Sequence, residues 1–318
     1  MDSSKTGAVI RTLRQRCGYT QKQLSDCLNV TDKAVSKWER GLSVPDISIL
    51  TKLSDLLNCD VDNLLEGDIT YLEKTWQGLL RTKHHTDFYI GTELFGKPLV
   101  DILLSYFLLA GIGDIYISCG EKDLAFLQNR WGNGKELGVN LFYLPEDQLP
   151  SKEANIMVVQ DNPFVYGSFL TRCFQRAMSR ENGVSILTLE KEKEPGESTV
   201  SFNNSREITS WEGKEKSQVC VPILFFPRRF FSNIKQCESI QKMGSLYAEP
   251  LDNGVIEYLI RDRETLLDTA FFIRYLEVRM NKRIYDMKEI ASKRGFLPVQ
   301  TLEDKPEVDC IMRSGRIK

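Results

Sequence analysis

The chain has 318 residues, of which 42% are hydrophobic and 27% are charged, so it can bury a core in each of about two soluble domains. Its formal net charge of -2 excludes a bulk electrostatic attraction to nucleic acid or membranes, and any DNA-binding face therefore has to be a local patch. The most apolar stretch, residues 99–112, contains Asp101 and falls short of the roughly 20 residues that a membrane-spanning helix needs.

The eight cysteines are scattered without a CxxC pair, and the only two histidines, His84 and His85, are adjacent. The N-terminus lacks the basic-then-apolar pattern of a secretory signal. We therefore expect reduced thiols in a cytoplasmic protein, without a disulfide framework, a zinc site or a membrane partner.

Up to residue 66 the sequence shows only helix signals. Apolar residues at helical spacing predict an amphipathic helix over residues 6–17. Thr20 and Gln23 form a capping box, which is typical of a helix start and predicts a second helix that runs to about Leu28. Asn29 and Val30 are expected to make a tight turn.

A third helix is predicted over residues 32–40, with Thr31 as its N-cap. A fourth helix opens at Pro45 and Asp46, and a short fifth helix is expected over residues 61–65. Two short helices joined by a tight turn and clamped by flanking helices are typical of a helix-turn-helix domain.

The third helix is then the one that lies in the major groove, with its N-terminal residues against base edges. Lys33 and Lys37 are one turn apart and suit guanine acceptors or phosphates, and Ser36 suits either role. Asp32 suits a cytosine amino group, or it complements the helix dipole. Arg40 also faces outward.

The string IRTLRQRCGYTQKQLSDCLNVTDKAVSKWERGLSVPDISILTKLSDLLNCDVDNLLEGD resembles the Cro/repressor-type (XRE) helix-turn-helix domain. The resemblance implies that Gln21, Arg40 and Ser43 meet the DNA backbone. The full set of expected DNA-binding residues is Gln21, Thr31, Asp32, Lys33, Ser36, Lys37, Arg40 and Ser43. Because one recognition helix covers only one half-site, and half-sites lie about 34 Å apart, we expect a homodimer on double-stranded DNA.

Residues 67–87 separate the two halves, and they are expected to form a connecting helix followed by a loop, or a partly ordered linker. The expected domains are thus residues 5–66, the connection 67–87, an α/β domain over residues 88–300 and a tail over residues 301–318. The segment that dimerises is not visible in the sequence, and the connection and the second domain are both candidates.

From residue 99 onward, helix-like and strand-like segments alternate. Helices are expected over residues 99–110, 123–131, 169–179 and 265–280, and strands over residues 115–118, 140–143, 156–160, 184–189, 200–202 and 219–226. Such alternation predicts an α/β (Rossmann-like) domain with a largely parallel, covered sheet. The fold class is therefore multidomain, an all-α five-helix domain followed by an α/β domain.

Several strings of this second domain, taken in order, resemble the sugar-phosphate nucleotidyltransferases, especially glucose-1-phosphate thymidylyltransferase. They are KPLVDILLSYFLLAGIGDIYIS, GNGKELGVNLFY, QDNPFVYGSFL, SFNNSREITSWEGK and LLDTAFFIRYLEVRMNKRIYDMKEIASKRGFLP. The resemblance implies a glycine-rich triphosphate loop and two aspartates that hold Mg²⁺.

Several residues that the resemblance implies for catalysis are absent from this sequence, and they belong to different parts of one site. The loop reads FYIGTELFGKPL, which keeps Gly91 and Thr92 but lacks the preceding glycines and the arginine. One metal-binding aspartate is present as Asp161, whereas the second aligns with Leu259. The segment after the LFY strand is shortened, and of an acidic-lysine pair that meets the sugar phosphate only the lysine, Lys214, is present.

We therefore expect a DNA-binding transcriptional regulator, not an enzyme and without a cofactor. Its second domain is expected to act as a sensor of a sugar phosphate or nucleotide or as a dimerisation domain, and Gly91, Thr92, Asp161 and Lys214 are the remnants of the ligand site. The alternative is an active nucleotidyltransferase that carries a DNA-binding domain and uses Mg²⁺ at Asp161. A third hypothesis is a scaffold that binds only protein. The operator, the ligand and the sign of regulation do not follow from the sequence.

Overall fold

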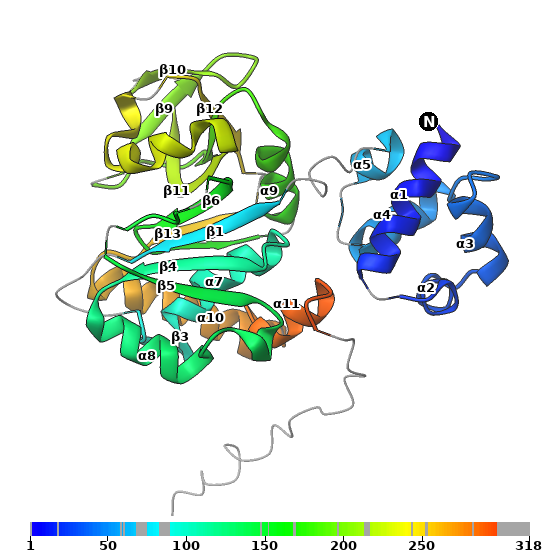
Figure 1. The fold of residues 1–318 in the computed structure, drawn as a ribbon, viewed down its shortest axis with the longest axis horizontal. Coiled ribbons are helices and arrows are strands. Elements are labelled where there is room, and N and C mark those ends of the chain that lie inside the picture. Colours follow the sequence, from blue (N-terminus) through cyan, green and yellow to red (C-terminus); the bar gives the residue numbers. More distant parts are fainter. Residues whose placement is uncertain are drawn as a thin grey trace, which may run out of the picture.

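The computed structural model describes residues 2–297, except for eight single residues, at 18, 58, 60, 147, 152, 196, 243 and 282, and for the ranges 68–74, 83–89, 168–169, 213–216 and 252–253. Five helices form the N-terminal domain (Figure 1), and they are α1 (Ser3–Arg16), α2 (Gln21–Leu28), α3 (Asp32–Glu39), α4 (Ile47–Leu57) and α5 (Val61–Glu66). Their apolar faces share one core, which includes Ile10, Leu24, Val35, Leu53 and Leu64.

Local signals set the ends of α2 and the start of α3 as predicted, whereas α1 begins three residues before its predicted start. Both hydrogen bonds of the capping box between Thr20 and Gln23 are formed at the start of α2. Asn29 adopts a left-handed conformation with φ of 56° and ends α2, a conformation that asparagine tolerates better than most residues. The Thr31 hydroxyl accepts from the Ala34 amide at 3.2 Å and begins α3. The predicted helix-turn-helix is thus confirmed.

A nine-stranded sheet with the order β10-β9-β11-β6-β1-β4-β5, in which β8 joins β11 and β12, forms the centre of the second domain. Its strands are β1 (Trp76–Arg81), β4 (Asp114–Cys119), β5 (Asn140–Pro145), β6 (Asn155–Gln160), β8 (Val184–Leu189), β9 (Thr199–Phe202), β10 (Ile208–Trp211), β11 (Gln218–Phe226) and β12 (Leu246–Pro250). The neighbours β5, β4, β1 and β6 are parallel, as are β8 and β12.

The expected largely parallel sheet is wrong in detail, because the sheet is mixed. Strand β11 runs antiparallel to β6, β8 and β9, and β9 is antiparallel to β10. A strand that is buried in either kind of sheet reads as the same apolar run, so the direction of β11 could not be taken from its sequence.

The expected connecting helix within residues 67–87 is corrected at residues 76–81, whereas residues 68–74 and 83–87 lie outside the described residues. Residues Trp76–Arg81 form β1, which pairs with β4 on one side and with β6 on the other. The α/β domain therefore begins before the expected boundary at residue 88. The apolar pair Leu79 and Leu80 supports a helix equally well in isolation, but in the sheet the two side chains enter the cores on opposite faces.

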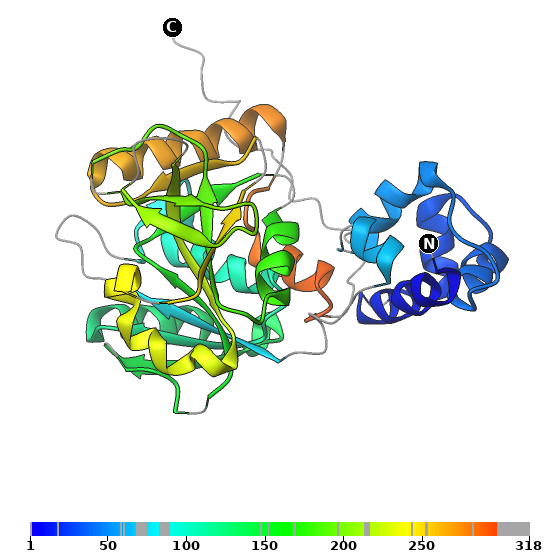
Figure 2. The same cartoon turned by 90° about the horizontal axis from the view of Figure 1, so that it is seen from above.

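Both faces of the sheet are covered (Figure 1). Helix α7 (Leu99–Leu109) is buried along its length and lies on one face with α8 (Glu121–Trp131) and α10 (Arg263–Met280). A 3-10 helix over Arg228–Lys242 places Ile234 in the core of the other face. Helices α9 (Leu170–Ser179) and α11 (Met287–Lys293) complete the domain, and α10 is seen along one edge in Figure 2.

Two short pairs of strands lie beside the main sheet. Strand β7 (Pro163–Tyr166) pairs with β13 (Ile256–Leu259), and β2 (Glu93–Leu94) forms a hairpin with β3 (Lys97–Pro98). A short 3-10 helix covers Lys135–Leu137. In the described part of the chain, no helix is both long and apolar enough to cross a membrane.

Candidate functional site

The outward face of α3 is basic. Lys33, Lys37 and Arg40 are exposed, whereas Val35 and Trp38 on the opposite face are buried in the core. The guanidinium of Arg40 donates from Nε to the Ser36 carbonyl at 3.2 Å, which holds this cation beside the end of the helix. The three cations that sequence analysis selected for base and phosphate contacts are thus all accessible on this face.

Two further predicted contact residues have local partners. The exposed Asp32 carboxylate accepts from the Lys33 amide at 2.8 Å, so it stabilises the N-terminus of α3 in the free protein. Ser43 is half-buried in the loop that follows α3, between the exposed side chains of Leu42 and Val44. The base and backbone contacts of these two residues stay predictions.

A buried ion pair fixes α3 against the first two helices. Arg14 on α1 donates to Glu39 at the end of α3, with Nε–Oε1 at 2.5 Å and Nη2–Oε2 at 3.3 Å. Its Nη1 also donates to the Tyr19 carbonyl at 2.6 Å. Gln21, expected to contact phosphate, donates from Nε2 to Glu39 Oε2 at 2.7 Å. Gln21 therefore also braces the recognition helix, and sequence analysis missed this role.

A close backbone approach positions α3 as well. A Cβ atom added to Gly7 of α1 would lie 2.1 Å from the Trp38 carbonyl oxygen, so only glycine permits this packing. Gly41, with φ of 69°, ends α3 in a conformation that strains other residues. Gly7 and Gly41 thus set the distance between α1 and the recognition helix.

In the second domain, the remnant residues Gly91, Thr92 and Asp161 follow the carboxyl ends of β1 and β6, which are neighbours in parallel register. The ends of parallel strands meet at one edge of the sheet, where ligands bind in open α/β folds. Asp161 directly follows β6 at this edge, whereas the chain between the end of β1 and Gly91 includes residues outside the described part. The carbonyl of Thr92 accepts from the Leu99 amide at 2.9 Å, which attaches the loop to the start of α7.

The turn around Asp161 lies directly beside β13. Asp161 and Asn162 both have left-handed backbone conformations, with φ of 56° and 52°. The Asn162 carbonyl accepts from the Ile260 amide at 3.2 Å, and Pro163 is paired with Leu259. Leu259 therefore lies where the resemblance places the second aspartate, and its side chain offers no oxygen to a cation.

Asp262, three residues further on, has a different task. It is the N-cap of α10, and its carboxylate accepts from the Thr265 amide at 2.8 Å in a capping box. This hydrogen bond lowers the pKa of Asp262. Mg²⁺ prefers oxygen ligands and is usually held by one or two carboxylates plus substrate phosphates. With Leu259 beside Asp161 and Asp262 engaged as a cap, the described residues do not fit the two-aspartate site.

Lys214, the fourth remnant, lies outside the described residues. An open cavity of about 310 Å³ lies near the ends of β8 and β12 and at the start of β11. It is lined by Leu189, Glu190, Gln218, Pro250, Leu251, Gly254 and Val255.

A buried ionic cluster not foreseen from the sequence lies close to this cavity. Lys191 binds two nearly buried carboxylates, Glu197 at 2.7 Å and Glu257 at 2.6 Å, and Arg261 lies 3.5 Å from Glu197. Burial raises the pKa of Glu257, although the ion pair with Lys191 opposes this effect. Lys191 and Glu197 belong to one charged run, residues 190–198, but their pairing with Glu257 and Arg261 joins segments that are distant in the chain, so the sequence did not indicate the cluster.

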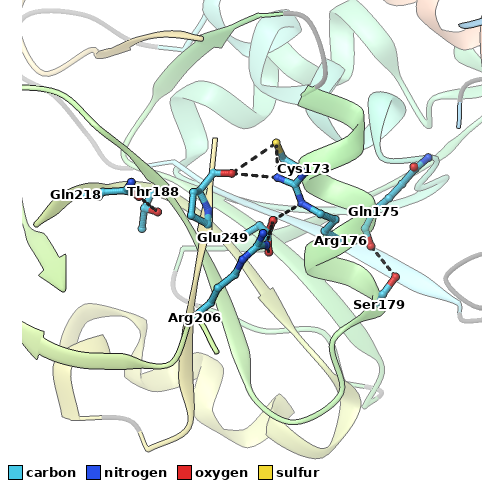
Figure 3. A network of polar contacts seen from close by, with 9 residues as sticks. Cys173, Gln175, Arg176, Ser179, Thr188, Arg206, Gln218 and Glu249 are labelled. Carbon is cyan, nitrogen blue, oxygen red and sulfur yellow. Dashed lines mark hydrogen bonds and ion pairs between the residues drawn. The ribbon is translucent and has the colours of Figure 1, made fainter. Parts of the chain in front are cut away.

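A second cluster joins α9 to β12. Figure 3 shows Arg176 and Arg206 both directed at the buried carboxylate of Glu249. The Arg176 Nε–Glu249 Oε1 distance is 2.5 Å, and Arg206 Nη1 lies 2.8 and 2.9 Å from the two carboxylate oxygens. Because each oxygen is hydrogen-bonded by a cation, this cluster satisfies itself and serves packing.

Comparisons with known proteins find relatives of both domains of the chain. A helix-turn-helix family model, HTH_3, matches residues 10–64. Over 62 residues the chain is 40% identical to the HTH-type transcriptional regulator ImmR of Bacillus subtilis, a match that covers 20% of this chain and 49% of that protein.

The second half is similar to glucose-1-phosphate thymidylyltransferase of Neisseria meningitidis, with 24% identity over 242 residues that cover 66% of this chain and 84% of that protein. A crystal structure from Bacillus anthracis, assigned to the glucose-1-phosphate thymidylyltransferases and solved with sucrose, matches with a TM-score of 0.51 at 15% identity, over 62% of this chain and 94% of that one. The chain thus joins an HTH_3 (XRE-type) helix-turn-helix domain to an α/β domain that is homologous to glucose-1-phosphate thymidylyltransferase.

Proposed function

We propose that this protein is a sequence-specific, homodimeric transcriptional regulator whose nucleotidyltransferase-like domain does not catalyse nucleotidyl transfer. The observation that carries the proposal is the exposed basic face of α3, held by the Arg14–Glu39 ion pair and by Gln21. A recognition helix has to be fixed on a rigid support, because loosely held side chains give poor discrimination between bases.

In this proposal Lys33 and Lys37 reach base edges or phosphates in the major groove. Arg40 and Ser43 meet the DNA backbone, which sets the register of the helix without reading sequence. The overall net charge is -2, so attraction to DNA comes from this local face and not from the whole chain.

The test uses a double-stranded site that the wild-type protein selects from a random library. Lys33→Ala combined with Lys37→Ala should weaken binding to this site roughly tenfold or more and reduce the salt dependence of the affinity. The matched control is Lys135→Ala, an exposed lysine in the second domain, which should bind like wild type. Failure to enrich any site, or unchanged binding by the double variant, would overturn the proposal and favour a protein-binding scaffold.

The non-catalytic reading is supported by Leu259 beside the Asp161 turn and by Asp262 as the cap of α10. Pyrophosphate release from dTTP and glucose 1-phosphate with Mg²⁺ should not exceed the background. The same assay with Asp161→Asn should give the same result. Turnover that is abolished by Asp161→Asn would instead establish an active transferase with a DNA-binding domain.

We further propose that the carboxyl edge of the sheet takes a sugar phosphate or a nucleotide, and that the ligand changes DNA affinity. The cavity of about 310 Å³ near β8 and β12 supports this role by its size and position. Thermal unfolding with glucose 1-phosphate and with a thymidine nucleotide tests it. Lys214→Ala should remove any ligand-induced shift, whereas Lys193→Ala should retain it. The absence of a shift for both ligands would leave dimerisation as the role of this domain.

A further inference from the structure

Helix α10 exposes a row of large apolar side chains. Leu267, Phe271, Tyr275 and Val278 are 47%, 63%, 59% and 63% exposed. They follow one another at intervals of three or four residues, so they lie along one face of the helix. Single exposed apolar residues are common, but a continuous row of this size, with two aromatic rings, marks an interaction surface.

The opposite face of α10 is already used. Ile273 and Leu276 are buried in the core of the α/β domain. The apolar row therefore is not a misplaced core face but a second apolar face on the same helix. A helix that is apolar on both faces is expected to be covered on both.

The row continues onto the neighbouring hairpin. Phe95, between β2 and β3, is 44% exposed, and the Arg274 guanidinium lies 5.7 Å from the centre of its ring. Lys97 in the same hairpin forms an ion pair with Glu277 of α10. The hairpin and α10 thus present one joined surface, which we name the α10 face and which consists of Phe95, Leu267, Phe271, Tyr275 and Val278.

The charges beside the α10 face are arranged for pairing with a copy of itself. Asp268 and Arg279 are both exposed, and their separation of eleven residues is about three helical turns, so they lie on the same flank of the row. In an antiparallel pair of α10 helices related by a two-fold axis, Asp268 of each copy meets Arg279 of the other. In a parallel pair, a two-fold axis along the helices would place the charged flanks of the two copies on opposite sides of the contact, and this pairing would be lost.

The same axis matches the apolar residues. It crosses α10 at about the level of residue 273 along the helix, so it brings Phe271 against Tyr275 of the second copy and Leu267 against Val278 of the second copy. Arg274 lies close to the axis, and its guanidinium makes a cation–π contact with the Phe95 ring of the same chain. The antiparallel arrangement thus matches apolar residues with apolar residues and Asp268 with Arg279.

We propose that two copies of this chain associate through the α10 face, with their α10 helices antiparallel. Such an isologous contact closes after two copies and so gives a dimer. This proposal rests on the proposed function, which requires a dimer, and it identifies the surface through which that dimer forms. The evidence for it is the α10 face alone, and its test involves no DNA. A failure of dimerisation is therefore distinguishable from a failure of DNA binding.

The first experiment measures the mass of the full chain by sedimentation over a series of concentrations. The wild-type protein should form a dimer, and Phe271→Glu should raise the dimer dissociation constant by about tenfold or more, as loss of an aromatic anchor does. The control is Phe142→Glu, an exposed aromatic residue on β5, which should dimerise like wild type. A milder variant, Tyr275→Ser, should also weaken the dimer. It should keep the circular dichroism and the melting temperature of the wild type, which separates weaker association from misfolding.

A charge exchange tests the antiparallel geometry. Asp268→Arg and Arg279→Asp should each weaken the dimer, because each places like charges together across the axis. The combination of both should restore it, because the pairing is exchanged but kept. A monomeric wild-type protein, a dimer that persists in folded Phe271→Glu, or a double variant weaker than both single variants would each overturn the proposal. The first of these results would also mean that something other than a second copy covers the α10 face.

Discussion

Arg14 and Glu39 form a bidentate ion pair between α1 and α3, with only 11% and 3% of their side chains exposed. The pair joins residues that are 25 positions apart and ends directly at the recognition helix. Removal of one partner from such a pair costs far more than removal of both, because the remaining charge is buried without compensation. The position of the DNA-facing lysines therefore depends on a carboxylate that does not face the DNA.

Glu39→Ala should destabilise the N-terminal domain by about 3 kcal/mol and weaken DNA binding, because Arg14 and Gln21 both lose their acceptor. Hydrogen exchange of the α3 amides and DNA affinity measure the two effects. The double variant Arg14→Met with Glu39→Met should regain most of the stability, since neither charge is then left alone. Equal losses in the single and double variants would show that the ion pair does not fix α3.

Gly7→Ala should lower the stability of the N-terminal domain by about 2 kcal/mol, although alanine is the better helix former. The reason is that the added methyl group would lie 2.1 Å from the Trp38 carbonyl oxygen, and α1 would have to move away from α3. Thermal unfolding measures the effect. The neighbouring substitution Ala8→Gly, at an exposed position, should cost only about 1 kcal/mol through helix propensity. A stabilised Gly7→Ala variant would contradict the packing described for α1 and α3.

The helix-turn-helix could be predicted almost completely from the sequence, because its ends are set by neighbours in the chain. The Thr20 and Gln23 capping box, the turn at Asn29 and the Thr31 cap all act within three residues. The braces could not be predicted in this way. The pairing of Arg14 with Glu39 exists only once α1 and α3 are packed together.

Strand β1 shows the limit of local patterns in the second domain. Its sequence WQGLLR has no β-branched residue, and its conformation is decided by pairing with β4 and β6. Gly78 permits the close packing of α7 on this strand, because a Cβ atom there would lie 2.6 Å from the Phe107 ring of α7. The neighbourhood of Leu259 and the Asp161 turn likewise depends on the pairing of β7 with β13, which joins segments that are distant in the chain.

Asp262→Ala should lower the melting temperature of the α/β domain, because α10 loses the hydrogen bond from the Thr265 amide to its N-cap. Asp262→Ser should retain most of the stability, since serine is also a good N-cap. Both variants should show the same response to Mg²⁺ as wild type, because Asp262 caps a helix in this protein. A Mg²⁺-induced rise in melting temperature that Asp262→Ala abolishes would assign this residue to a metal site instead.

Glu257 should make stability depend on pH in a direction set by its burial. Desolvation raises its pKa in the folded protein, so its ionised form costs stability at any pH above that raised value. As the pH falls from the raised pKa to below 4.5, the pKa of Glu257 in the unfolded chain, this cost disappears. Wild type should therefore gain stability relative to Glu257→Gln on acidification, and urea midpoints of the two proteins between neutral and acidic pH measure the difference. Lys191→Met should shift this gain to higher pH, because the ion pair with Lys191 holds the pKa of Glu257 down. A difference between wild type and Glu257→Gln that moves in the opposite direction would mean that the ion pair outweighs the desolvation.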